Sequence, residues 1–167
     1  MFTEHTLESA PPASRRAMES TIKHLGHLPP AVAKLASSPQ LLDGFLKLSA
    51  MFEQTTLDPV VREVVVMVVA ARNECHVCVE MHTGKLRALG ADEHVIAALR
   101  ERQPLDDERL EAVRQFTLEA LRTAGGVGEA ELKAFFGHGY TEQNALEVVM
   151  GIGTYTMSTL ANRLTRA

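Results

Sequence analysis

Apolar side chains recur along most of this chain with the three-to-four-residue spacing that one face of an α-helix produces. The clearest example covers residues 39–52, where the apolar positions form a single stripe. Proline and glycine separate the apolar segments, as they commonly do at the ends of helices. We therefore predict an all-α fold of about eight or nine helices. The expected helices cover residues 13–25, 29–36, 39–52, 59–71, 75–89, 92–102, 106–123, a short segment ending at 136, and 141–164.

The most apolar segment, residues 59–71, is expected to form a central helix that is buried on nearly all sides. Its sequence after Pro59 is VVREVVVMVVAA, which leaves almost no polar face. The many β-branched residues would also suit a strand. A helix is favoured because Asp58 can cap free backbone N–H groups, because proline suits the first position of a helix, and because the neighbouring segments all have helical spacing.

The chain is expected to form one helical domain preceded by a short arm. We expect residues 1–12 to form a loose N-terminal arm and residues 13–167 to form a single domain whose core motif covers residues 58–90. Hydrophobic residues make up 46% of the chain, which is enough for a buried core. Aromatic residues make up only 5% and tryptophan is absent, so aliphatic side chains must fill most of that core. Such a composition suits helices better than a β-sandwich.

The charge and the hydropathy of the chain exclude two classes of partner. The formal net charge is −4, whereas a nucleic-acid-binding protein needs a basic surface. The longest apolar stretch, residues 64–71, is far shorter than the roughly 20 residues that span a bilayer. The first residues lack the apolar segment of a secretory signal, so we expect a soluble cytoplasmic protein. In that compartment a close pair of cysteines indicates catalytic, redox or metal-binding chemistry rather than a structural disulfide.

The only two cysteines, Cys75 and Cys78, lie three residues apart at the predicted start of a helix. This spacing places both sulfurs on one face, and the positive end of a helix favours a thiolate. His82 lies one turn after Cys78 on the same face, where it can exchange a proton with that thiol. The helix start favours Cys75 as the attacking sulfur, whereas His82 favours Cys78. These arguments leave the order of the two cysteines open.

Glu63 is a carboxylic acid in the middle of the central apolar helix. Its neighbours three and four residues away are Val60, Val66, Pro59 and Met67, so its side chain lies on an apolar face. An unpaired buried carboxylate costs several kcal/mol, so the group must share its charge or its proton with a partner. One candidate is the histidine of the following helix, which would make the carboxyl part of a proton relay. A structural ion pair with a distant arginine or lysine is the alternative.

Together these residues resemble a known family. Eleven residues separate Glu63 from Cys75, two separate the cysteines, and three separate Cys78 from His82. This spacing and the surrounding sequence resemble the alkylhydroperoxidase D-like (AhpD-like) group of the carboxymuconolactone decarboxylase family over residues 40–101. The resemblance implies an AhpD-like helical fold, assembly into a homo-oligomer such as a trimer or hexamer, and no bound cofactor.

The resemblance also implies a role for each matched residue. Cys78 would be the thiolate that a small hydroperoxide oxidises, and Cys75 would then form a disulfide with it. Glu63 and His82 would form the proton relay that activates the thiol. A thioredoxin-like or dihydrolipoyl protein would act as the reductant. The implied enzyme is an alkylhydroperoxidase-like peroxidase or disulfide oxidoreductase.

Val77 departs from the best-known branch of that family, which has a histidine immediately before the second cysteine. The neighbouring His76 cannot replace it, because consecutive residues of a helix point about 100° apart. This departure therefore favours general disulfide reductase chemistry over peroxide reduction.

Three other interpretations stay open. Two cysteines, one histidine and one glutamate can surround zinc, although no second pair of ligands occurs at a familiar spacing. The wider family is named for decarboxylation of a lactone acid, but that branch generally lacks the cysteine pair. A non-catalytic redox sensor or oligomeric regulatory protein would share the first oxidation step of a peroxidase. Turnover with a reductant distinguishes a sensor from an enzyme.

Overall fold

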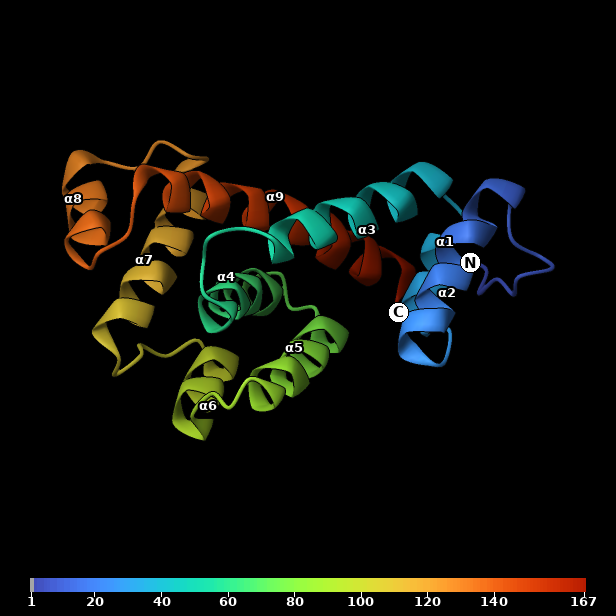
Figure 1. Ribbon diagram of the computed structural model, residues 1–167, viewed down its shortest axis with the longest axis horizontal. Coiled ribbons are helices and arrows are strands. Elements are labelled where there is room, and N and C mark those ends of the chain that lie inside the picture. Colours follow the sequence, from blue (N-terminus) through green and yellow to red (C-terminus); the bar gives the residue numbers. More distant parts are fainter. Residues whose placement is uncertain (1) are drawn as a thin grey trace.

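The computed structural model describes residues 2–167, and every regular element within them is an α-helix (Figure 1). The predicted all-α fold is confirmed, and the expected segments coincide with helices apart from their terminal residues. The CxxC motif lies at the start of a central helix, α5, also as predicted. No helix in this described part combines the length and the hydrophobicity needed to cross a membrane. The helices are α1 (Pro12–Leu25), α2 (Pro30–Leu35), α3 (Pro39–Glu53), α4 (Pro59–Arg72), α5 (His76–Ala88), α6 (Glu93–Glu101), α7 (Glu108–Thr123), α8 (Glu129–Gly137) and α9 (Glu142–Thr165).

Helix α4 forms the centre of the fold. Figure 1 shows it end-on, with α3 and α9 on one side and α5 and α6 on the other, and it packs against α5, α6, α7 and α9. Ten of its fourteen residues are buried. A valine costs a helix at most about 0.7 kcal/mol relative to alanine, whereas burying its side chain contributes about 1.5 kcal/mol or more. Burial therefore outweighs the β-branched preference for a strand.

The predicted cap at the start of α4 is wrong. Asp58 precedes the helix, but its side chain makes no hydrogen bond to the first turn. Its carboxylate instead lies 3.6 Å from Nη2 of Arg109 on α7. Helix α9, by contrast, begins with a full capping box, in which Thr141 and Asn144 satisfy each other's backbone N–H groups. Pro59 lacks an N–H group and so removes one of the free donors of the first turn, while the carboxylate of Asp58 faces Arg109 instead of the other free N–H groups.

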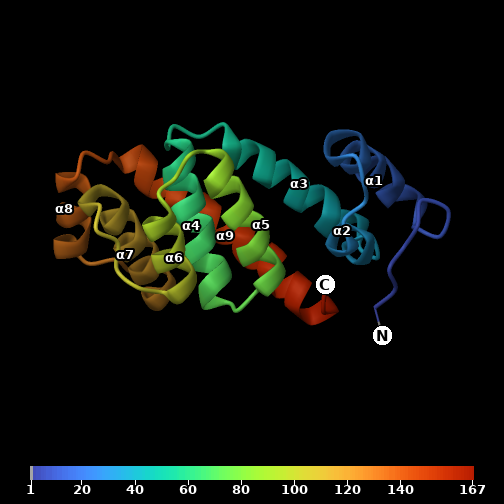
Figure 2. The same cartoon turned by 90° about the horizontal axis from the view of Figure 1, so that it is seen from below.

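The two largest hydrophobic clusters of the described residues are joined by the helices α3 and α9. The larger cluster surrounds α4 and includes Phe52 of α3 and Tyr155 of α9. The smaller cluster lies between α1, α2 and α3, and includes Leu42 of α3 and Ala161 of α9. Figure 2 shows α1 and α2 at one end of the molecule and α8 at the other. The expectation of one domain over residues 13–167 stays a prediction.

The predicted N-terminal arm, residues 1–12, precedes and enters α1. Met1 lies outside the described residues. The backbone N–H of His5 donates a hydrogen bond to the carbonyl oxygen of Ala33 on α2, at 3.2 Å. Ala10 is buried in the smaller hydrophobic cluster. His5 and Ala10 of this segment therefore both contact the helical part of the chain.

One side of α9 exposes large apolar side chains. Leu146 and Leu164 are 72% and 68% exposed, and Val149 and Leu160 are about half exposed. Their spacing places all four on one face of the helix. Assembly into a homo-oligomer stays a prediction.

Two glycines in the middle of α9 have opposite surroundings. A Cβ atom on Gly151 would lie 2.7 Å from two ring carbons of Phe52 and 3.1 Å from Cγ1 of Val65. Both neighbours are fully buried, so neither can move aside freely. A Cβ atom on Gly153 would meet nothing within 4 Å in the same chain. Gly151 thus permits the close packing of α9 on α3 and α4.

We expect Gly151→Ala to destabilise the protein and Gly153→Ala to stabilise it. Alanine favours a helix over glycine by up to about 1 kcal/mol, but overpacking a core typically costs about 1–3 kcal/mol. The net expectation is a loss of about 1 kcal/mol at position 151 and a gain of up to about that amount at 153. Urea denaturation of both variants measures the free energy of unfolding. Equal effects at the two positions would contradict the packing argument.

Candidate active site

Glu63 and His82 meet at the interface between α4 and α5. Oε2 of Glu63 lies 2.6 Å from Nδ1 of His82, and the two residues are only 7% and 1% exposed. The expected contact between them is therefore present. Because the carboxylate accepts, the Nδ1 atom carries the proton and Nε2 of a neutral imidazole keeps its lone pair. Nε2 is buried and has no hydrogen-bond partner among the described residues.

Lys85 is a second partner of Glu63, which the sequence analysis did not identify. Its Nζ atom lies 3.8 Å from Oε1 of Glu63 and 3.0 Å from Oε1 of Glu53 on α3. Burial disfavours the charged form of Lys85, but the negative charge of Glu63 and the hydrogen bond to Glu53 outweigh it and raise its pKa. Glu63 therefore has both kinds of partner considered above. Lys85 follows His82 by three residues on the same face of α5, so helical spacing could have identified it.

Glu63 also borders a surface cavity that neither cysteine lines. With Lys85 it lines a surface cavity of about 370 Å³ between α4 and α5. A carboxylate that bonds a buried imidazole and borders such a cavity can pass a proton between the imidazole and solvent.

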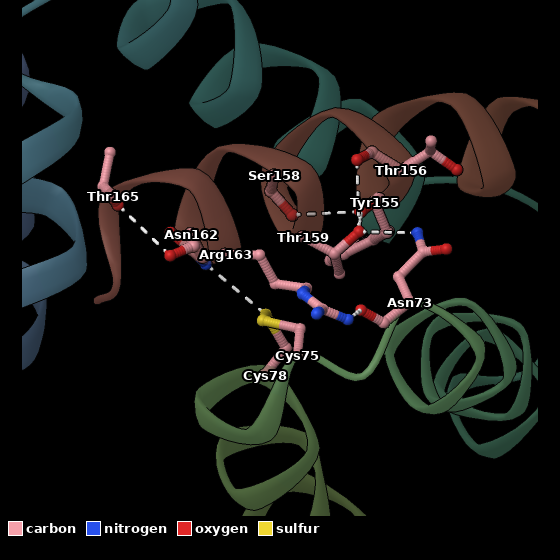
Figure 3. Close-up of a disulfide and its surroundings, with 10 residues drawn as sticks. All are labelled: Asn73, Cys75, Cys78, Tyr155, Thr156, Ser158, Thr159, Asn162, Arg163 and Thr165. Carbon is pink, nitrogen blue, oxygen red and sulfur yellow. Dashed lines mark hydrogen bonds between the residues drawn. A yellow bond between two sulfur atoms is a disulfide. The ribbon is translucent and has the colours of Figure 1, made fainter.

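The two cysteines are joined by a disulfide at the start of α5 (Figure 3). Cys75 is the residue immediately before the helix and Cys78 lies in its first turn, with 5.3 Å between their Cα atoms. They are 1% and 3% exposed. The spacing argument therefore placed both sulfurs correctly within bonding distance.

His82 makes no hydrogen bond to Cys78 in this disulfide form. A disulfide sulfur has no proton to donate, whereas a reduced thiol at this position has one. A hydrogen bond between these groups requires the reduced thiol, which lies one helical turn from the imidazole.

Tyr155 of α9 packs against the imidazole ring of His82. The ring centroids of His82 and Tyr155 lie 5.3 Å apart with an interplanar angle of 87°, an edge-to-face contact. The tyrosine hydroxyl forms a hydrogen bond of 3.2 Å with the hydroxyl of Ser49 on α3. Burial raises the pKa of Tyr155, and the bond with Ser49 only partly offsets this effect. The phenol therefore stays neutral and fixes the orientation of His82.

The turn between α4 and α5 is tied to α9 by three hydrogen bonds, and Figure 3 draws those that involve Asn73. Nδ2 of Asn73 donates to Oγ1 of Thr159 at 2.9 Å. Nη1 of Arg163 donates to the carbonyl oxygen of Asn73 at 2.6 Å and to Oε2 of Glu74 at 3.0 Å. The bond with Arg163 lowers the pKa of Glu74. Because Glu74 has a left-handed φ of 54°, these bonds hold the backbone in the turn that positions Cys75.

A cavity of about 220 Å³ opens beside the cysteine pair. It gives a small molecule room next to the start of α5. Val77, the residue that departs from the family pattern, is 40% exposed at this cavity. The lining residues are Glu74, Cys75, His76, Val77, Asn162, Arg163, Arg166 and Ala167.

The four predicted site residues do not form a metal-ligand set in this structure. Within residues 2–167, no three side chains of His, Cys, Asp or Glu are grouped so that they could hold a metal ion. The structure brings Glu63 to His82 and Cys75 to Cys78 instead. The two pairs share helix α5.

Comparison with known proteins identifies a matching family and similar structures. Residues 39–119 match the carboxymuconolactone decarboxylase family. No curated protein matches the sequence. A peroxidase-related protein from Ralstonia eutropha JMP134, described as an alkylhydroperoxidase AhpD core, has a similar structure, with a TM-score of 0.84 and 21% identity over 98% of this chain and 88% of that one.

Two further structures have the same fold at lower identity. A peroxidase-related protein from Silicibacter sp. TM1040 has a TM-score of 0.80 and 20% identity over 99% of this chain and 89% of that one. The debrominase Bmp8 has a TM-score of 0.79 and 16% identity over 100% of this chain and 90% of that one. At these identities the similarity establishes the fold alone. Residues 39–119 thus resemble the carboxymuconolactone decarboxylase family, and the chain has the AhpD-like fold.

Proposed function

We propose that the protein is a thiol-dependent oxidoreductase that reduces small hydroperoxides or disulfides through Cys75 and Cys78. The observation that carries this proposal is the buried hydrogen bond between Glu63 and His82, on the same helix as the cysteine pair. A free thiol has a pKa of about 8.5 and is mostly protonated at neutral pH. A redox dithiol therefore needs a group that accepts its proton, and the Nε2 atom of His82, which no residue of 2–167 bonds, is available for it.

In the oxidative half of the reaction, His82 takes the proton of Cys78 while Glu63 stabilises the imidazolium. The Cys78 thiolate attacks one oxygen of a hydroperoxide and the O–O bond breaks. The alkoxide leaves as an alcohol with the proton from His82, and Cys78 becomes a sulfenic acid. Cys75 then attacks the Cys78 sulfur, which forms the disulfide and releases water. The disulfide is the state that this structure shows.

In the reductive half, a dithiol returns two electrons to the cysteine pair. One thiolate of the reductant attacks the disulfide to form a mixed disulfide, and its second thiol displaces the protein sulfur. We propose a thioredoxin-like or dihydrolipoyl protein for this role. If the reduced cysteine pair instead attacked an external disulfide, the same thiol–disulfide exchange would make the protein a disulfide reductase.

A turnover assay tests the proposal. The reduced protein is mixed with an alkyl hydroperoxide, an organic disulfide or a brominated pyrrole, each with thioredoxin or dihydrolipoamide as reductant. The brominated pyrrole is included because a debrominase has the same fold. We expect hydroperoxide or disulfide consumption that continues as long as reductant is present. A single oxidation per chain without continued consumption would indicate a redox sensor and would refute the enzymatic proposal.

A further inference from the structure

The side chain of Asn162 contacts one sulfur of the redox pair. Its Nδ2 atom donates a hydrogen bond of 3.4 Å to Sγ of Cys78, across 84 residues of sequence (Figure 3). Asn162 lies on α9 and is only 8% exposed. A disulfide sulfur can accept a hydrogen bond but has no proton to donate, so the NH₂ end of the amide must face it.

The opposite end of the same amide has no partner. Oδ1 of Asn162 is buried and makes no hydrogen bond with any described residue. Burying an unsatisfied amide oxygen is costly, so a purely structural role gives no reason to keep an amide at this position. The contact with the sulfur, rather than a network of structural bonds, is what the side chain provides.

The amide cannot easily turn away from the sulfur. Arg163, the next residue on α9, donates hydrogen bonds to Asn73 and Glu74 in the turn before Cys75. Thr159, one turn earlier, accepts a bond from the side chain of Asn73. The segment of α9 that carries Asn162 is therefore fixed on both sides against the turn that holds the cysteine pair.

We propose that Asn162 is a catalytic residue that stabilises the thiolate of Cys78, an inference that rests on the proposed function. When the reductant's thiolate attacks Sγ of Cys75, the bond between the two protein sulfurs breaks. The electron pair of that bond moves to Sγ of Cys78, which leaves as a thiolate. A hydrogen bond to a charged acceptor is about twice as strong as one to a neutral acceptor, so the amide binds this product more tightly than the disulfide.

This contact distinguishes the two cysteines. No side-chain hydrogen bond to Sγ of Cys75 is present among the described residues, whereas Cys78 has the amide of Asn162. A lower thiol pKa makes a better leaving group and gives a larger thiolate fraction. The geometry therefore favours Cys78 as the sulfur that leaves during reduction and attacks during oxidation.

The charged groups near Cys78 have other partners or other roles. His82 on its own helix is bonded to Glu63 of α4 through Nδ1. Arg163 of α9 is engaged with Glu74. Removing the amide therefore leaves Cys78 with the proton acceptor His82 but without a neutral hydrogen-bond donor, and these two effects can be measured separately.

The test measures the titration of a single thiol. In the Cys75→Ser background, the ultraviolet absorbance of the thiolate is followed against pH with and without substitutions at Asn162. We expect Asn162→Leu to raise the pKa of Cys78 by about one unit. Asn162→Asp should raise it further, because a carboxylate of the same shape repels the thiolate. Asn73→Ala is the matched control, because it removes a bond between the same turn and α9 without touching sulfur.

The outcomes separate this inference from the proposed function. An unchanged Cys78 pKa in Asn162→Leu, or an equal shift in Asn73→Ala, would overturn the role of the amide even if the wild-type protein turns over hydroperoxide. A raised pKa in the Asn162 variants alone supports that role, whatever substrate the turnover assay identifies. If Asn162→Leu does not fold, the smaller Asn162→Ala, which also lacks the N–H donor and adds no charge, decides the question by the presence or absence of a raised pKa of Cys78.

Discussion

Replacing Cys78 by serine is expected to abolish turnover completely, whereas replacing Cys75 by serine is expected to leave one oxidation per chain. Cys78 accepts the hydrogen bond of Asn162 and lies one turn before His82 on α5, the residue that we propose as its proton acceptor. Without Cys75, the sulfenic acid formed on Cys78 has no resolving thiol. Stopped-flow mixing of each reduced variant with hydroperoxide, followed by mass spectrometry, measures the rate and the product.

Each of the two variants is the control for the other, because both lack the disulfide and both keep one cysteine. Each must keep the helical circular dichroism of the parent protein. If the Cys78→Ser variant formed a sulfenic acid on Cys75 as fast as the parent protein is oxidised, Cys75 would be the attacking cysteine and Cys78 the resolving one. That result would also contradict the assignment made from Asn162.

Replacing Glu63 by glutamine is expected to slow oxidation of the reduced dithiol by about a hundredfold or more, the usual size of a general-base contribution. Glutamine keeps the shape of the side chain and can still accept a hydrogen bond from Nδ1 of His82. It removes the negative charge that stabilises the imidazolium formed when His82 takes the thiol proton. The rate constant for reaction with hydroperoxide, measured in a single turnover at neutral pH, tests this expectation.

Glu53→Gln is the matched control for this experiment. Glu53 is bonded to the same Lys85, at 3.0 Å, but makes no hydrogen bond to His82 and is exposed. We expect its rate to match that of the parent protein. A rate in Glu63→Gln within a factor of about two of the parent would show that the carboxyl is a structural partner of Lys85 and not part of a relay.

The energetic coupling between the two relay residues can be measured directly. If Glu63 acts through the imidazole, the loss caused by Glu63→Gln should largely disappear in a variant that already lacks His82. Additive losses in the double variant would instead indicate that the two residues act independently.

The sequence by itself determined the helical fold and the local part of the site. Apolar spacing and helix-ending residues are properties of neighbouring positions, so they predicted each helix of the described residues apart from its terminal residues, including the central α4 despite its β-branched residues. The spacing of Cys75, Cys78 and His82 on one helix is equally local. The apolar surroundings of Glu63 showed that it needed a partner but did not decide between histidine and a distant cation.

Only the tertiary structure decided the contacts between helices that are distant in the sequence. It gave Glu63 both His82 and Lys85, brought Asn162 to Cys78, and showed that Gly151 rather than Gly153 is needed for close packing. It also showed that Asp58 pairs with α7 instead of capping α4. Such contacts depend on how α9 and α7 pack against α4, and the periodicity of one helix contains no information on which residue of another helix will face it.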